Sequence, residues 1–193
     1  MRRTRFDGFE AVYRSEVMKM YAMDLEEGIR IIEPTLPVDC SVHECSVAPD
    51  IVEQSVLQER SVKGDTILVA YFQRNPVAYL FAATTDTWVD EIDDWFHIAP
   101  YEVYLYDAHT LPEYRGRRIY PFLMYSAADY FRRKTFHHAM IFSTARNVGS
   151  VKGIERCGFK CYEFVKYRNL LGCKCWQYKI GERHVESRLG NEN

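Results

Sequence analysis

The sequence lacks the features that mark several classes of protein. No apolar run approaches the roughly 20 residues that a transmembrane helix needs, and the start, residues 1–6, has no apolar core like that of a signal peptide. Its 25 Lys and Arg residues against 27 Asp and Glu give a net charge of −2, whereas a general nucleic-acid binder needs a broad basic surface. We therefore expect a soluble, cytoplasmic protein that binds neither nucleic acid nor membrane.

Metal, disulfide and nucleotide signatures are also missing. Six cysteines occur, but none forms a CxxC pair, and Cys40, His43 and Cys45 lack a fourth ligand at the usual spacing. A chain of this length without an export signal favours reduced thiols. Neither the GxxxxGK[ST] spacing of a P-loop nor a Rossmann glycine fingerprint is present. The sequence therefore predicts no metal site and no site of either nucleotide-binding kind.

What the chain does contain is a large apolar and aromatic fraction. Of its 193 residues, 47% are hydrophobic and 15% aromatic, enough to bury the core of one globular domain. Residues 1–48 are predicted to form an N-terminal extension with additional strands, including a short strand at 28–32, and residues 181–193 a polar tail. Between them, the apolar spacing predicts a helix at 49–64, strands at 66–72, 77–85 and 101–110, a helix at 121–134, a strand at 139–145, a helix at 147–156, and a hairpin at 159–180.

The order of these elements predicts the fold class. A strand at 101–110, a helix and a strand at 139–145 require a right-handed crossover, which makes the two strands parallel. The remaining strands can pair antiparallel as hairpins. We therefore expect an α/β (α+β) fold with a mixed, mostly antiparallel sheet and flanking helices over residues 49–180.

A short turn between the strand at 101–110 and the following helix has the chemistry of a phosphate cradle. The turn runs from Leu111 to Tyr120 and contains one glycine and three arginines. A helix start presents unpaired backbone amides and the positive end of the helix dipole, and arginines add forked donors for the same anion. The alternative is an ordinary charged helix start.

Two motifs in this region resemble the GNAT superfamily of acyl-CoA N-acyltransferases. The first, Arg/Gln-x-x-Gly-x-Gly/Ala, corresponds to residues 115–120, Arg-Gly-Arg-Arg-Ile-Tyr. The second, Asn-x-x-Ser/Ala, then an aromatic, then Gly-Phe, corresponds to Asn147-Val-Gly-Ser150 and Gly158-Phe159. The resemblance extends over residues 49–180. It implies a GNAT fold whose central parallel strands splay apart, and direct transfer of an acetyl group from acetyl-CoA to a primary amine.

The resemblance also implies which residues bind acetyl-CoA. The pantetheine arm would pair with the free edge of a central strand, and one amide there would polarise the thioester carbonyl. The amides of the first motif would hold the pyrophosphate, and the second motif would contact the arm. The residues expected at these places are Ala108, His109, Thr110, Arg115, Gly116, Arg117, Arg118, Ile119, Tyr120, Asn147 and Ser150.

The sequence departs from the family pattern at three positions. Arg118 replaces the glycine at the fourth position of the first motif, and Tyr120 replaces its last small residue. The tyrosine that often acts as the family's general acid falls on Ile154, which has no proton to donate. If the backbone still approaches the pyrophosphate, the side chain of Arg118 must point outward; the alternative is a smaller pocket or a weakened cofactor site.

Direct transfer needs a base for the amine and an acid for the thiolate. The even positions of strand 101–110 share one face, so we expect Glu102 as the base and Tyr104 as a pocket residue or proton donor. Tyr104 stands where the histone-modifying branch of the family has its catalytic glutamate. His109 is a weaker candidate because its odd position points to the other face, and His97 lies on a loop.

The acidic stretch 86–95 would lie near the acceptor end of the site. Its carboxylates would attract a protonated amine, and Trp88 or Trp95 could form a wall for the carbon skeleton. The alternative is a solvated loop anchored by two tryptophans. We expect a small acceptor: an amino sugar, an amino acid or a polyamine.

A second interpretation belongs to another functional class. The replaced glycines and the missing tyrosine are also consistent with a non-catalytic GNAT-fold protein that serves as a CoA-binding sensor or interaction module. Residues 1–48 could extend the sheet, cover the acceptor site or form a homodimer contact.

Overall fold

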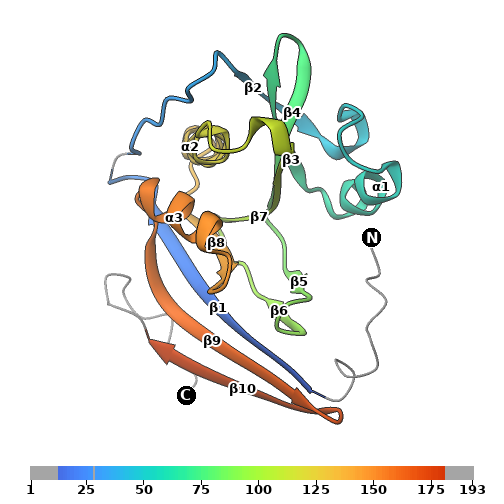
Figure 1. The fold of residues 1–193 in the computed structure, drawn as a ribbon, viewed down its shortest axis with the longest axis vertical. Helices are drawn as coiled ribbons and strands as arrows, with labels where there is room; N and C mark the ends of the chain where they lie inside the picture. Colours follow the sequence, from blue (N-terminus) through green and yellow to red (C-terminus); the bar gives the residue numbers. More distant parts are fainter. Residues whose placement is uncertain (1–12, 28, 181–193) are drawn as a thin grey trace.

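One curved sheet of eight strands organises the chain (Figure 1). The computed structural model describes residues 13–27 and 29–180. The order across the sheet is β10-β9-β1-β8-β7-β4-β3-β2. The strands are β1 (Tyr13–Asp24), β2 (Asp39–Glu44), β3 (Thr66–Phe72), β4 (Asn75–Ala83), β7 (Glu102–Thr110), β8 (His138–Thr144), β9 (Lys160–Leu170) and β10 (Cys173–Ile180).

The fold class predicted from the sequence is confirmed. Strands β7 and β8 run parallel, and the other neighbouring strands pair antiparallel. The crossover between the parallel strands is α2 (Ile119–Arg133). Mixed sheets of this kind need helices on their faces to bury the central strands.

The N-terminal strand lies inside the sheet rather than at its edge. Strand β1 pairs with β8 over residues 18–24 and with β9 over residues 13–22. Residues 20–23 of β1 are consecutively buried, as expected for a strand with neighbours on both edges and side chains packed on both faces. Segment 1–48 therefore contributes β1 and β2 to the same sheet as residues 49–180.

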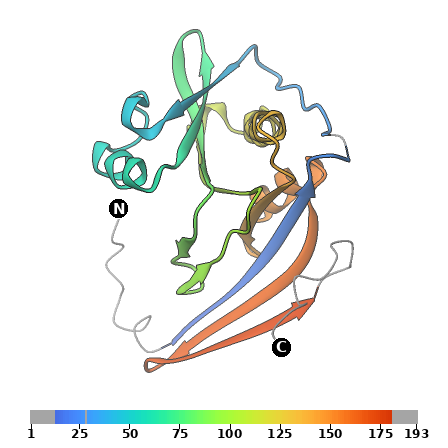
Figure 2. The ribbon, with the colours of Figure 1, turned by 180° about the vertical axis from the view of Figure 1, so that it is seen from behind.

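Different elements cover the two faces of the sheet. Helices α2 and α3 (Val148–Arg156) lie on one side of β7, whereas α1 (Gln54–Lys63) and a small hairpin lie on the other (Figure 1). The hairpin consists of β5 (Thr87–Val89) and β6 (Asp94–Phe96). Strands β1, β9 and β10 curve round beyond this hairpin (Figure 2). Two short 3-10 helices, η1 (Cys45–Val47) and η2 (Pro112–Tyr114), connect elements.

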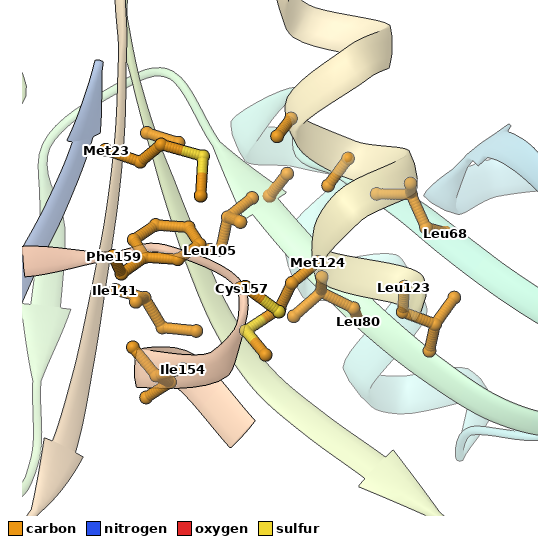
Figure 3. Packing of buried hydrophobic residues seen from close by; sticks show 14 of the residues in the cluster. Met23, Leu68, Leu80, Leu105, Leu123, Met124, Ile141, Ile154, Cys157 and Phe159 are labelled. Atoms are coloured by element: carbon orange, nitrogen blue, oxygen red, sulfur yellow. The ribbon is translucent and has the colours of Figure 1, made fainter. Parts of the chain in front are cut away.

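The largest core cluster lies under α2 and α3. The apolar residues of α2 recur at helical spacing, so Leu123 and Met124 face Leu80 of β4 and Leu105 of β7. Figure 3 shows the same cluster continuing to Phe159, just before β9. This packing fixes the start of α2 beside the middle of the sheet.

Two local predictions are wrong. The first helix begins at Gln54 rather than at residue 49, because the amide of Ile51 bonds to the carbonyl of Pro49 in a tight turn. Residues 29–32, predicted as a strand, form none; Ile29 and Ile32 pack instead against the core beneath α2. Residue 28 of that prediction lies outside the described residues. The small β5–β6 hairpin within the acidic stretch was not predicted.

Candidate active site

The two central strands part half-way along their length. Strands β7 and β8 pair from Glu102 with His138 to Leu105 with Ile141, and their ladder ends there. Beyond that point, residues 106–110 and 142–144 line a cleft of about 860 Å³. The backbone groups of the separated strands are free to pair with an extended ligand there.

A bulge in β7 shapes the wall of this cleft. Tyr106 lies opposite Phe81 of β4, but His109 lies opposite Tyr79, so β7 contains one extra residue. Asp107 adopts the left-handed backbone conformation within the bulge, with φ of 44°. The extra residue reverses the alternation of side chains beyond it.

The bulge corrects the prediction for His109. Its ring stacks on Tyr79 at 5.8 Å, and Tyr79 and Tyr106 both contact Phe81 on one face of the sheet. His109 therefore shares a face with Tyr106 rather than lying on the opposite one. It lines the cleft, as do Ala108 and Thr110.

Alternation determines which backbone groups beyond the bulge face the cleft. The amide of Leu111 donates to Val77 of β4, and His109 pairs with β4 in the same register. The backbone groups of Ala108 and Thr110 then point toward β8. Consistently, Arg115 donates from Nε to the carbonyl of Thr110 at 3.0 Å.

The first motif forms the start of α2 at one end of the cleft. Gly116 has φ of 75°, and Arg118, the residue before the helix, has φ of 60°. Arg118 thus keeps the left-handed conformation that glycine favours, and the amides of the first helical turn have no carbonyl of the helix to bind. The carbonyl of Arg117 points away from them, because it accepts from the Thr35 amide at 3.0 Å.

Most residues of the first motif line the cleft. Arg115, Gly116, Arg118, Ile119 and Tyr120 do so, whereas Arg117 does not. Two further cations on α3 line it, Lys152 and Arg156, and neither was predicted from the sequence. Their spacing of four residues on a helix that begins at the second motif was the available signal.

The second motif joins α3 to α2. Asn147 caps α3 by accepting from the Ser150 amide at 3.1 Å. The hydroxyl of Ser150 lies 3.1 Å from that of Tyr120, and burial raises the pKa of Tyr120 to about 12. Asn147 and Ser150 both line the cleft. Tyr120, in the position of the motif's small residue, directs its ring toward Gly153 of α3.

The structure separates the two catalytic candidates. Tyr104 lines the cleft, and the centre of its ring lies 5.2 Å from that of Phe96 and 4.8 Å from that of Phe142. Burial raises its pKa far above the usual value, so the phenol stays protonated. Glu102 lies at the start of β7, where its Oε2 accepts from the Ala99 amide at 3.0 Å. It is not among the residues that line the cleft, because the strands are still paired at this end.

The two tryptophans predicted to form an aromatic wall of the site lie on the β5–β6 hairpin outside the cleft. The rings of Trp88 and Trp95 contact each other at 5.7 Å across the β5–β6 hairpin, and the residues are 40% and 54% exposed. Neither lines the cleft. The residue of the acidic stretch that does is Glu91, in the turn of that hairpin.

Residues 35–159 match the family described as the acetyltransferase (GNAT) family. The match covers more than half of the chain, from β2 to the end of α3, and contains both motifs. The chain belongs to the GNAT family. No curated protein matches it closely enough to count as a relative.

Solved structures share this GNAT fold. A Drosophila protein has a TM-score of 0.57 and 12% identity, over 86% of this chain and 55% of that one. A GCN5-related N-acetyltransferase from Sphaerobacter thermophilus has a TM-score of 0.55 and 13% identity, over 84% and 54%. For a tandem GNAT protein from the clavulanic acid biosynthesis pathway the values are 0.53 and 12%, over 82% and 54%. The chain thus spans little more than half the length of these three structures.

A polar network supports the bulge of the GNAT cleft from α1. Arg60 pairs with Asp107 at 2.6 Å, and its guanidinium lies 3.8 Å from the ring centre of Phe81. Beside it, Tyr106 donates to Asp65 at 2.5 Å. Asp65 is 4% exposed, and burial raises its pKa. The network fixes the left-handed residue of the bulge to a neighbouring element.

The thiols of this GNAT chain are unpaired. All six cysteines are free, and burial raises the pKa of Cys45 to about 11 and that of Cys157 to about 12. Among residues 13–27 and 29–180, no group of three or more His, Cys, Asp or Glu side chains could hold a metal ion. No helix in the same residues is long and apolar enough to cross a membrane.

Proposed function

We propose that this protein transfers an acetyl group from acetyl-CoA to a primary amine of a small acceptor. The observation that carries the proposal is the cleft between β7 and β8. It joins two chemically different ends, a cationic one at α2 and α3 and an aromatic one with a carboxylate at the β5–β6 hairpin. An acyl donor and an amine approaching from opposite faces of the sheet would meet where the strands part.

The residues of the cationic end fit acetyl-CoA. The amides of residues 117–120, at the positive end of the α2 dipole, suit a pyrophosphate, and Arg115 and Arg118 line the same space. Lys152 and Arg156 add positive charge for further phosphate oxygens. The backbone groups that Ala108 and Thr110 direct into the cleft suit the amides of a pantetheine arm.

Bound acetyl-CoA would supply the reactive thioester. The amide that Ala108 directs into the cleft would donate to the thioester carbonyl. Tyr104, kept protonated by burial, would donate a hydrogen bond to the leaving sulfur, and the thiolate would take its proton from water. The amine forms its bond to the acyl carbon as the bond to sulfur breaks, and its own proton leaves to water.

Calorimetric titration with acetyl-CoA and free CoA tests the donor site. We expect saturable binding that Arg118→Ala weakens about tenfold, the size of one lost charge-assisted hydrogen bond. Arg117→Ala is the matched control, because Arg117 adjoins Arg118 but does not line the cleft. Equal losses in both variants, or no binding at millimolar ligand, would contradict the donor site.

Thiol release with a panel of amines then tests catalysis. We expect turnover that depends on the amine and that Tyr104→Phe reduces without abolishing acetyl-CoA binding. Saturable binding of acetyl-CoA with no thioester cleavage by any amine would instead favour the non-catalytic sensor or interaction module.

A further inference from the structure

Glu91 is a carboxylate that lines the cleft and has no cationic side chain paired with it among the described residues. Two acidic residues of the described chain line the cleft, Glu91 and Asp107. Asp107 is paired with Arg60 at 2.6 Å. The carboxylate of Glu91 forms no ion pair with any residue in the described segments. An unneutralised carboxylate at an acceptor site favours a positively charged group of the ligand.

The backbone around Glu91 is anchored by three strands on the far side of the hairpin. Arg14 of β1 donates to the carbonyls of Asp90 at 2.8 Å and Glu91 at 3.3 Å. Trp176 of β10 donates to the carbonyl of Ile92 at 2.7 Å. The carboxylate of Asp93 accepts from Tyr167 of β9 and pairs with Lys174 of β10.

These contacts are made by backbone carbonyls of the turn and by the side chain of Asp93. None of them involves the side chain of Glu91, which lines the cleft. Val89 and Ile92, on either side, are 3% and 5% exposed. The turn is thus fixed both by the packing of its buried side chains and by hydrogen bonds to its carbonyls. A carboxylate carried by such a turn is pre-organised for a ligand.

The surroundings of Glu91 suit an alkyl ammonium group. The Glu91 carboxylate is near enough to Tyr104 that, after burial, it is the next cause of the raised pKa of that phenol. The rings of Tyr104, Tyr106 and Phe142 line the same part of the cleft. Aromatic faces beside a carboxylate bind the methylene groups and the positive charge of an amine.

The reacting nitrogen must be neutral when it attacks the thioester, so an ammonium that stays paired with the Glu91 carboxylate during the reaction is a different nitrogen. We propose that Glu91 binds a second, non-reacting ammonium group, so that the acceptor is a diamine or polyamine. This inference rests on the proposed acyltransferase function. An α-amino acid would place its own carboxylate near Glu91, and like charges in a confined cleft repel.

The test compares three acceptors of similar length: putrescine, n-butylamine and γ-aminobutyrate. For the wild type we expect a kcat/KM for putrescine about tenfold above that for butylamine, the size of one charge-assisted contact, and the lowest value for aminobutyrate. Glu91→Gln should lower kcat/KM for putrescine far more than for butylamine. Asp90→Asn is the matched control, since Asp90 is an exposed carboxylate of the same turn outside the cleft.

Two results would overturn the inference while leaving acyl transfer intact: equal use of putrescine and butylamine by the wild type, or an unchanged preference in Glu91→Gln. If none of the amines is acetylated, calorimetric titration of putrescine into the CoA-saturated protein decides separately. Putrescine binding that is lost in Glu91→Gln and kept in Asp90→Asn supports the diamine site without catalysis. Absent or Glu91-independent binding rejects it.

Discussion

Arg118 has a backbone conformation that its own side chain disfavours. With φ of 60° it stands where glycine would be least strained, and a left-handed residue costs an L-amino acid about 1–2 kcal/mol. The strain keeps the amides at the start of α2 facing the cleft. Arg118 therefore holds this geometry at a cost in stability that glycine would not incur.

Substitution at this position separates strain from charge. Arg118→Gly and Arg118→Ala both remove the guanidinium, but only glycine relieves the left-handed conformation. We expect the glycine variant to be more stable than the alanine variant by about 1 kcal/mol, measured by chemical denaturation. In a helix interior the order would be reversed. An alanine variant as stable as the glycine variant would show that the start of α2 is not strained.

The raised pKa of Asp65 predicts that the free energy of unfolding depends on pH. Burial is the largest cause of its raised pKa, opposed by the hydrogen bond from Tyr106 and by the charges of Lys63 and Arg60; nearby Glu59 raises it further. A carboxyl with a higher pKa in the folded protein binds more protons when folded. Its stabilising contribution is therefore complete below the usual pKa of 3.8 and is lost as the pH rises through the folded pKa.

Asp65→Asn removes this titration while keeping an oxygen that can accept from Tyr106. We expect the free energy of unfolding of the variant, relative to the wild type, to increase as the pH rises from about 4 to 7. Carboxyls with lowered pKa, such as Asp86 and Asp129, act in the opposite direction but are common to both proteins and cancel. A pH-independent difference in denaturation experiments would rule out this role for Asp65.

At the scale of elements, α3 packs closely against the start of α2 beside the cleft. A Cβ built on Gly153 would lie 3.0 Å from the ring of Tyr120, whereas one on Gly149 of the same helix would meet nothing nearer than 3.8 Å. The Tyr120 ring has little freedom to move, because its hydroxyl is bonded to Ser150. The position of α3 against the start of α2 therefore depends on one glycine.

Gly153→Ala should destabilise the protein by about 1–3 kcal/mol through overpacking. Gly149→Ala should be neutral or stabilising by up to about 1 kcal/mol, because alanine is the better helix former. Thermal unfolding of the two single variants measures both effects. In a Tyr120→Ala background the cost of Gly153→Ala should disappear; a cost that persists there would mean that another contact is responsible.

The elements that could be predicted from the sequence are those with local signals. The apolar spacing of α2, the hairpin of β3 and β4 and the motif at residues 115–120 each lie within one short segment. The side of the sheet that His109 faces could not be predicted, because a bulge at Asp107 is defined only by register against β4. Likewise, Glu91 reaches the cleft through contacts with β1, β9 and β10, which are remote in sequence.

Glu102, the base predicted from the sequence, also shows that local patterns do not reveal features defined by contacts remote in sequence. Alternation correctly places Glu102 in β7, but it does not show where β7 and β8 separate. The parallel ladder includes Glu102 and ends at Leu105, so the cleft begins beyond the predicted base. The point of separation is a property of two strands joined by a helix, and only tertiary packing defines it.

At the scale of the whole molecule, β1 connects the two ends of the chain. It fills the place between β8 and β9 with ladders to both, and its turn-anchoring residue Arg14 reaches the hairpin that carries Glu91. Without β1, the edges of β8 and β9 would be unpaired, and β9 and β10 would lose their connection to the sheet. The C-terminal hairpin thus depends on the N-terminal strand.

A chain that begins at residue 29 should therefore fail to fold. Four large side chains of β1, Met18, Met20, Tyr21 and Met23, are at most 7% exposed, and burial of each contributes about 1.5–3 kcal/mol. Their sum is comparable to the whole stability of a typical domain, about 5–15 kcal/mol. We expect no cooperative thermal transition and no acetyl-CoA binding from this truncated chain.

The matched control is a chain that ends at Leu170 and lacks β10. Strand β10 lies at the edge of the sheet with mostly exposed side chains, so its loss should leave a cooperative transition and acetyl-CoA binding. It removes Trp176 and Lys174 from the turn around Glu91, so the preference for putrescine over butylamine should fall. A stable chain without β1 would contradict the central role of that strand, and an unchanged amine preference without β10 would show that β1 and β9 alone position the turn.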